Sequence, residues 1–365
     1  MFDFNAINNQ LKKYLVFGFA ILLGSSLLVS PLVIGQASDT SQCDDYKPIH
    51  GAWYLGQGWD SYATGSVKED LTKIRDDLCA NYISIQANVY QDNMYSSDPS
   101  IRDKTVNDKV LAWVVNQIHD LGMKTVLLTP LNPEDGTWQG NIQPTDIDEW
   151  FDHWKDILVH YAKFAEENDV EVLLLGSELP TLRDKPESWK EIIEEIRIHY
   201  SGEISFSVNF WTERSEFREV LNMTQWEGMD YIGITGYFEL TRSSDPSVDQ
   251  LRQAWSSDMH GQDVLEDLRK ISDKFNKPVV FWEIGYQSKN GTNTYPWNYL
   301  REGEKDEEEQ KDSWIGFLQA IKDKEWIHGF MAFAEQVGLP GDNPGYHGYN
   351  MLGKKTQTVF CNICQ

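Results

Sequence analysis

Two glutamates in this chain follow apolar segments of the kind that form buried strands. Glu178 comes directly after residues 172–177, and Glu283 comes directly after residues 279–282. Two carboxyl groups that distant strands bring to one end of a barrel can hydrolyse a glycosidic bond, one as proton donor and the other as nucleophile. A separation of about 5–5.5 Å between them predicts that the anomeric configuration is retained.

The elements that must position this pair alternate in type along the chain. Eight β-type segments are expected, at residues 50–55, 81–90, 124–132, 171–178, 203–210, 230–238, 278–286 and 327–335. Several of them are continuous apolar runs, which is typical of parallel strands covered by helices. Amphipathic helical patterns lie between them, among others at residues 67–79, 106–121, 146–168 and 188–200.

This alternation predicts an α/β fold, a single-domain (β/α)8 TIM barrel. Asp146 and Ser188 are candidate N-caps, and Gly122 is a termination signal for the helix before it. An open doubly wound sheet is the alternative. Residues 56–58, Gly-Gln-Gly, lack the third glycine of a dinucleotide-binding turn, so the barrel is favoured.

The active site of such a barrel lies at the C-terminal ends of its strands. We expect Glu178 and Glu283, which end the fourth and seventh segments, to face each other from opposite sides of the mouth. The alternative is that both are ordinary carboxylates paired with helix N-termini or arginines. Other acidic residues also lie near strand ends. Glu335 is the most plausible substitute for one of the catalytic glutamates, because it ends an apolar run. The others are Glu134, Asp135, Glu213 and Glu239.

Other barrel chemistries find little support in the sequence. No His-x-His stands at a strand end and no Gly-x-Ser-x-Gly occurs, which disfavours a metal-dependent amidohydrolase and a serine hydrolase. Lys124 and Lys277 stand where strands begin, at the wrong end for Schiff-base chemistry. No cofactor and no metal are expected, because two carboxyl groups supply both the proton transfer and the nucleophile.

Composition narrows the range of partners. The formal net charge of −25 over 365 residues disfavours nucleic acid and anionic membrane surfaces. The 14 Trp and 16 Tyr either anchor a large core or line a groove for an oligo- or polysaccharide. The acidic run at residues 301–312 is interpreted as a solvated loop and helix start, since its spacing matches no calcium-binding loop.

The N-terminal segment carries targeting information. Lys12 and Lys13 precede an apolar stretch at residues 14–34, and small residues follow up to Ala37. This pattern predicts a signal peptide at residues 1–37, with an uncleaved signal anchor as the alternative. We therefore expect a catalytic domain at residues 38–365 that is secreted, periplasmic or held at the cell surface, and that acts as a monomer.

Export would allow the four cysteines to form disulfides. Cys43 and Cys79 lie near the first strand and helix, whereas Cys361 and Cys364 lie near the C-terminus. Three pairings are possible and all of them stay open. A zinc site and a redox-active Cys-x-x-Cys are weaker alternatives.

Several short segments resemble glycoside hydrolase family 113 from about Gly51 to Thr358. They are residues 88–92 (NVYQD), 136–140 (GTWQG), 176–179 (GSEL), 230–233 (DYIG), 282–286 (WEIGY), and the tail around Gly345-Tyr346 and residues 353–355 (GKK). The resemblance implies a retaining (β/α)8 barrel, known in this family to act on β-mannans, with Glu178 as acid/base and Glu283 as nucleophile. It also implies that Tyr237 donates a hydrogen bond to Glu283.

The same resemblance suggests which side chains contact the sugar. Tyr237 is one candidate, and the others are Trp59, Tyr90, Trp138, Asn209, Trp211 and Trp282. The chain departs from the wider clan at Ser177, where asparagine is usual, at residues 129–131, where Lys-Pro-His is expected, and at residues 331–335, which lack tryptophan. The expected activity is endo-hydrolysis of β-1,4-mannan or a related β-linked hexose polymer; the alternative is a carbohydrate-binding surface barrel with little or no turnover.

Overall fold

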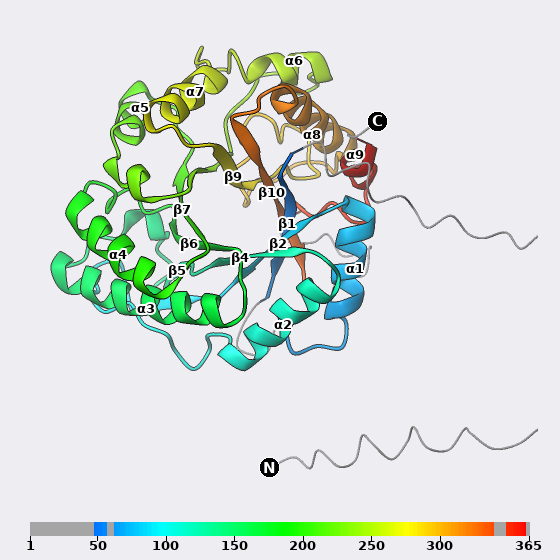
Figure 1. The fold of residues 1–365 in the computed structure, drawn as a ribbon. Helices are drawn as coiled ribbons and strands as arrows, with labels where there is room; N and C mark the ends of the chain where they lie inside the picture. Colours follow the sequence, from blue (N-terminus) through cyan, green and yellow to red (C-terminus); the bar gives the residue numbers. More distant parts are fainter. Residues whose placement is uncertain (1–46, 57–61, 339–347, 363–365) are drawn as a thin grey trace, which may run out of the picture. The chain divides into compact units, whose positions relative to one another are not determined.

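The fold is a closed barrel of eight parallel strands surrounded by helices. The computed structural model describes residues 47–56, 62–338 and 348–362. Around the barrel the strands follow the order β1-β10-β9-β8-β7-β6-β4-β2 (Figure 1). Their bounds are β1 Ile49–Leu55, β2 Tyr82–Gln86, β4 Lys124–Leu128, β6 Val172–Ser177, β7 Glu203–Asn209, β8 Tyr231–Thr235, β9 Val279–Ile284 and β10 Ile327–Gln336. The predicted (β/α)8 barrel is confirmed, and the doubly wound sheet is wrong.

Two predicted segments each contain a barrel strand and a second, shorter strand. β3 (Val89–Gln91) and β5 (Leu131–Pro133) pair in parallel outside the barrel. The ladder between the two segments continues through the Ala87 N–H, which donates to the Leu128 carbonyl at 2.9 Å. This extension carries the loop that follows β5 to the same end of the barrel as Glu178.

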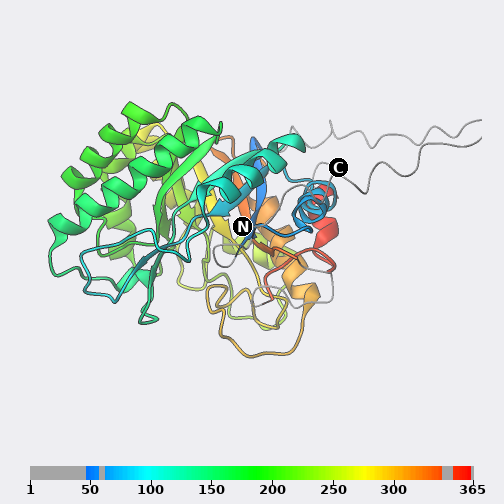
Figure 2. The same cartoon turned by 90° about the horizontal axis from the view of Figure 1, so that it is seen from below.

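Helices cover the outside of the barrel, and Figure 2 gives a second view of this layer. Their bounds are α1 Val67–Leu78, α2 Asp108–Asp120, α3 Ile147–Glu167, α4 Pro186–His199, α5 Arg214–Leu221, α6 Val248–Ala254, α7 Val264–Phe275, α8 Glu307–Ile321 and α9 Gln357–Asn362. Asp146 caps α3 by accepting a hydrogen bond from the Glu149 N–H at 3.1 Å, as predicted. The prediction of Ser188 as a cap is wrong, because α4 begins at Pro186, whose fixed φ suits the first helical turn.

Two other predictions about helix ends are confirmed. Gly122 follows α2 with φ +78°, a left-handed conformation that costs glycine little. The acidic run ends in a helix start, because α8 begins at Glu307 and Asp306 accepts the Glu309 N–H at 2.9 Å. Three glutamates in the first turn of α8 interact favourably with the helix dipole.

Apolar side chains form two separate layers. The larger one lies between strands and helices, where residues such as Trp154, Trp189 and Trp255 are fully buried. The smaller one fills the barrel interior and includes Trp53 and Trp282. Filling of the interior by bulky side chains is the usual arrangement of such barrels, and it makes the barrel a solid support for its mouth.

A disulfide joins the two ends of the described fold. Cys79, which follows α1, is bonded to Cys361 in α9, a bond that belongs to one of the three pairings that the sequence left open. Cys43, Cys364 and the predicted signal at residues 1–37 lie outside the described residues. Within the described ranges, no helix is both long and apolar enough to cross a membrane.

Candidate active site

Glu178 lies just beyond β6 in an unusual backbone conformation. Its φ is +55°, in the left-handed region that residues with a side chain rarely adopt. The Glu178 N–H donates to the Ser207 carbonyl at 2.9 Å, which ties the residue to β7. The turn and this hydrogen bond fix the direction in which the carboxyl group leaves the strand.

Four side chains donate hydrogen bonds to the Glu178 carboxyl group. Thr235 Oγ1 donates to Oε1 at 3.0 Å, while Trp138 Nε1 and Gln139 Nε2 each donate to Oε2 at 3.2 Å. Asn209 contributes a further hydrogen bond. Burial raises the pKa of Glu178, and the hydrogen bonds from Thr235, Trp138 and Asn209 partly offset that rise.

Glu283 lies near the end of β9, where the pairing with β8 is irregular. Ile234 pairs with Phe281 and Thr235 pairs with Glu283, so β9 carries one additional residue at this point. Such a bulge re-aims the side chains that follow it. The Tyr237 hydroxyl donates to Glu283 Oε1 at 2.6 Å, as the resemblance implied.

The two carboxyl groups interact electrostatically. Burial, followed by the negative charge of Glu178, raises the pKa of Glu283 to about 8, and the hydrogen bond from Tyr237 opposes the rise. Two carboxyl groups that repel each other in a buried site retain one proton between them over a range of pH. The site therefore offers one proton donor and one anion at the same time.

The strand order refines the expected geometry of the pair. β6 and β9 are separated by β7 and β8, so they are three positions apart around the barrel. This is one step short of directly opposite in an eight-stranded barrel, which agrees with the expectation that the two glutamates face each other across the mouth.

Aromatic rings support the tyrosine that bonds Glu283. The Tyr237 ring packs edge-on against Phe333 at 6.4 Å and lies 6.2 Å from Tyr349, between ring centroids. The Tyr349 hydroxyl in turn donates to the Pro296 carbonyl. Burial and the charge of Glu283 hold the pKa of Tyr237 well above its ordinary value, so the phenol stays a hydrogen-bond donor.

Besides Tyr237, three of the predicted sugar contacts lie at or beside this mouth. Trp138 is 45% exposed and Asn209 bonds Glu178, so both border the catalytic pair. Tyr90 is half-buried in β3, and Lys104 Nζ lies 3.9 Å from its ring centroid. Trp59 falls outside the described residues.

The structure corrects two other predicted contacts. Trp211 is 2% exposed and packs against Phe217 and Phe238 in the layer between strands and helices. Trp282 is fully buried in the barrel interior, where its indole N–H donates to Ser205 Oγ at 2.8 Å. Both indoles are therefore core side chains and not contacts for a substrate.

The competing carboxylates have structural partners. Glu335 is 1% exposed and accepts the backbone N–H groups of Met351 and Leu352 at 2.6 and 2.9 Å. Burial raises the pKa of Glu335 to about 7, and its role is to hold that backbone segment. Glu134 pairs with Arg102 and Lys104, so neither glutamate substitutes for the catalytic pair.

Sequence reasoning missed the donors Thr235 and Gln139. Thr235 is the last residue of β8, and Gln139 directly follows the predicted Trp138. The strand-end rule that identified the glutamates could have indicated Thr235 as well. Nothing in the composition of the loop distinguishes Gln139.

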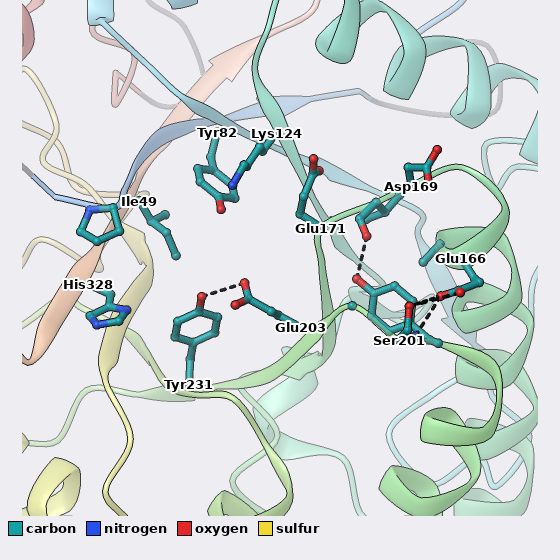
Figure 3. A pocket seen from close by; sticks show the side chains of 15 residues that line it. Ile49, Tyr82, Lys124, Glu166, Asp169, Glu171, Ser201, Glu203, Tyr231 and His328 are labelled. Carbon is teal, nitrogen blue, oxygen red and sulfur yellow. Dashed lines mark hydrogen bonds between the residues drawn. The ribbon is translucent and has the colours of Figure 1, made fainter. Parts of the chain in front are cut away.

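A cavity of about 600 Å³ opens at the other end of the barrel. Its wall contains the first residues of β2, β4, β7 and β8, which are Tyr82, Lys124, Glu203 and Tyr231 (Figure 3). The Tyr231 hydroxyl donates to Glu203 at 2.7 Å. Because all of these residues begin strands, the cavity lies away from Glu178 and Glu283, and it is not the catalytic site. Among the described residues, no cluster of three or more His, Cys, Asp or Glu side chains could hold a metal ion.

Comparison with known proteins gives one family and several related folds. The profile of Glycoside Hydrolase Family 113 matches residues 52–354. A structure described as a complex of a GH113 β-1,4-mannanase has a TM-score of 0.75 and 22% identity, covering 87% of this chain and 98% of that chain. The GH113 β-mannanase AaManA from Alicyclobacillus acidocaldarius, in complex with ManMIm, has a TM-score of 0.75 and 22% identity, covering 88% of this chain and 98% of that chain.

More distant barrels share the fold. The hyperthermostable endo-1,4-β-D-mannanase from Thermotoga petrophila RKU-1 has a TM-score of 0.54 and 14% identity, covering 87% of this chain and 98% of that chain. No curated protein matches the sequence significantly.

Proposed function

The chain belongs to glycoside hydrolase family 113, and on this premise we propose that it is a retaining, endo-acting hydrolase of β-1,4-mannan or a related β-linked hexose polymer. One observation carries the mechanism: two buried carboxyl groups interact at the mouth, and a tyrosine donates a hydrogen bond to one of them at 2.6 Å. That pair supplies an acid and a nucleophile without any further group.

In the first step, Glu283 attacks the anomeric carbon while Glu178 gives its proton to the leaving glycosidic oxygen. The C–O bond to the leaving sugar breaks and an ester between Glu283 and the sugar forms. The Tyr237 hydroxyl stabilises the Glu283 carboxylate before the attack. In the second step, Glu178 takes a proton from water, the water oxygen attacks the anomeric carbon, and Glu283 leaves as a carboxylate.

The substrate proposal rests on the relatives and on the site together. Two GH113 structures similar to this chain are described as β-1,4-mannanase and β-mannanase. Trp138 lies half-exposed beside the acid, where an aromatic face can pack against a sugar ring. Leu131 is buried in β5 where the wider clan places a polar residue, so another β-linked hexose polymer is the second candidate.

Reducing-sugar release tests this proposal directly. The protein from Ser38 onward would be incubated with mannan, glucomannan, xylan, β-glucan and chitin oligomers, each beside a Glu283→Gln control. Release from mannan that disappears in the control is the expected result. Release from another polymer alone would reject the mannan assignment, and no release from any polymer by folded protein would reject the hydrolase proposal in favour of a carbohydrate-binding barrel.

We also propose that the protein is exported and acts as a monomer. The apolar segment at residues 14–34 and the small residues up to Ala37 support a signal peptide. The disulfide between Cys79 and Cys361 agrees with an oxidising compartment. N-terminal sequencing of the mature protein should begin at Ser38, and an intact N-terminus in the membrane fraction would favour the signal anchor.

A further inference from the structure

Three tryptophans in the described part of the chain expose more than two-fifths of their surface. They are Trp113 at 41%, Trp138 at 45% and Trp297 at 44%. Trp113 lies on the outer helix α2, whereas Trp138 bonds the catalytic Glu178. Trp297 was not among the predicted site residues, and its surroundings differ from those of an ordinary surface side chain.

The polar edge of Trp297 is fixed by a buried carboxylate. Its indole N–H donates to Glu239 Oε1 at 2.8 Å, and Glu239 is 7% exposed. The other oxygen of Glu239 lies 2.7 Å from His260 Nε2, so both sides of the carboxylate are engaged. Its N–H is satisfied inside the protein and the Tyr295 ring packs edge-to-face with it at 6.2 Å between centroids, while 44% of the residue stays exposed and can contact another partner.

The loop that carries Trp297 is connected to the nucleophile through a series of contacts. The preceding residue, Pro296, accepts a hydrogen bond from the Tyr349 hydroxyl, and the Tyr349 ring packs against Tyr237. Tyr237 is the residue that bonds Glu283. A short series of direct contacts therefore connects the position of Trp297 with the position of the nucleophile.

The loop that carries Trp297 is anchored on two sides. It connects β9 with α8 and extends from the lower side of the barrel in Figure 2. Glu309 in α8 accepts hydrogen bonds from the N–H of Gly291 at 2.5 Å and from Asn293 Nδ2 at 2.8 Å. The Leu240 N–H donates to the Asn293 carbonyl at 2.9 Å, which joins the loop to the segment after β8. Such anchoring pre-organises an exposed ring for binding.

We propose that Trp297 is a sugar-binding platform for a hexose unit outside the two units that flank the cleaved bond. Glu239 and His260 are positioning residues that hold its indole. The ligand class is a β-linked hexose chain long enough to extend beyond the catalytic pair, and this inference rests on the proposed function. Trp138, which bonds Glu178 directly after β6, and Trp297, which bonds Glu239 in the segment that follows β8, then contact different units of the same chain.

The test compares Trp297→Ala with Trp113→Ala, a control that removes an equally exposed tryptophan far from the mouth. Substrates are β-1,4-linked mannose oligomers of increasing length and a small aryl β-mannoside. Trp297→Ala should raise KM for the longest oligomers about tenfold, which corresponds to about 1.4 kcal/mol. Its kcat/KM for the aryl glycoside should stay unchanged, and Trp113→Ala should match the wild type on every substrate.

Variants of the positioning residue sharpen the test. Glu239→Ala should reproduce part of the rise in KM, while Glu239→Gln, which keeps an oxygen acceptor for the indole N–H, should restore the affinity. Equal KM values for the two tryptophan variants on long oligomers would overturn the inference. A loss as large on the aryl glycoside as on the oligomers would also overturn it, because a distal platform does not contact the small substrate.

Failure of the proposed function can be recognised separately. If the wild type cleaves another β-linked hexose polymer, the same series is run with its oligomers and only the mannan assignment is lost. If the wild type cleaves none of the polymers, calorimetric titration with mannohexaose still tests whether Trp297 binds the sugar chain. Binding that Trp297→Ala weakens and Trp113→Ala preserves supports the platform, and equal binding by both variants rejects it.

Discussion

The Tyr237 hydroxyl donates a hydrogen bond of 2.6 Å to Oε1 of Glu283. This bond comes from the segment directly after β8 to a residue of β9, so it joins neighbouring elements of the mouth. A donor in this position favours the ionised form of the carboxyl group that must attack the sugar. The predictions below start from this bond and from its counterpart around Glu178.

Tyr237→Phe removes the hydrogen bond but keeps the ring that packs against Phe333 and Tyr349. Hydrogen bonds to charged groups contribute about 1.5–3 kcal/mol, so kcat/KM on an aryl glycoside should fall roughly 10- to 100-fold. The acid limb of the pH profile should also move to higher pH, because the pKa of Glu283 rises without the donor.

Tyr349→Phe is the control for that experiment. It removes the hydrogen bond to the Pro296 carbonyl and leaves Glu283 bonded to Tyr237. Its acid limb should coincide with that of the wild type. An unchanged profile in Tyr237→Phe would show that the tyrosine does not affect the ionisation of Glu283.

Replacement of each glutamate separates the two catalytic roles. Glu283→Ala should abolish turnover of every substrate because no nucleophile remains. Glu178→Ala should slow polymer hydrolysis by roughly 10²- to 10⁴-fold, the usual contribution of general acid catalysis, and should form the glycosyl-enzyme readily from dinitrophenyl glycosides. A good leaving group needs no protonation.

Azide provides a positive readout for Glu178→Ala. A small anion needs no general base, so azide should restore turnover of dinitrophenyl glycosides and yield a glycosyl azide of retained configuration. Equal losses on activated and unactivated substrates would contradict the assignment of Glu178 as the acid.

The dependence of activity on pH follows from the shared proton. Burial and the charge of Glu178 raise the pKa of Glu283 to about 8, so the pair loses its last proton as the pH rises through that region. Above it, no acid remains to protonate the leaving oxygen, and kcat/KM on polymers should decline. At low pH a second proton neutralises the nucleophile, and activity declines again.

Glu178→Gln should change this profile in a defined direction. The glutamine amide is uncharged, as Glu178 is when it holds the shared proton, so the acid limb on dinitrophenyl glycosides, which reports protonation of Glu283 beside a neutral group, should stay near its wild-type position. The basic limb should disappear for these substrates. A basic limb that persists at its wild-type pH would indicate that the two carboxyl groups do not share the proton lost there.

The disulfide between Cys79 and Cys361 should stabilise the fold without affecting catalysis. It closes a sequence separation of 282 residues and links α1 to α9. Cys361→Ser should lower the free energy of unfolding by roughly 2–5 kcal/mol and lower Tm, with kcat unchanged at 25 °C. Cys79→Ser should lower Tm by the same amount, and the double variant should lose no more than either single variant; additive losses would contradict the assigned bond.

The sequence was sufficient for the barrel and the catalytic pair because both depend on strong periodic signals. Continuous apolar runs identified the strands, and the strand-end rule then selected Glu178 and Glu283. It was wrong about Trp282, because alternation along β9 places this ring in the barrel interior, whereas one additional residue turns the neighbouring Glu283 toward the mouth. It also missed Trp297, because only the folded loop brings the indole N–H of that residue to the buried carboxylate of Glu239.

The left-handed backbone of Glu178 has a consequence for substitution at this position. A residue with a side chain is disfavoured there by about 1 kcal/mol or more, and glycine would relieve the strain. Glycine would also remove the carboxyl group that the surrounding donors bond, and with it the catalytic acid. A homologue with glycine at position 178 would therefore have a relaxed backbone at the end of β6 and no catalytic acid.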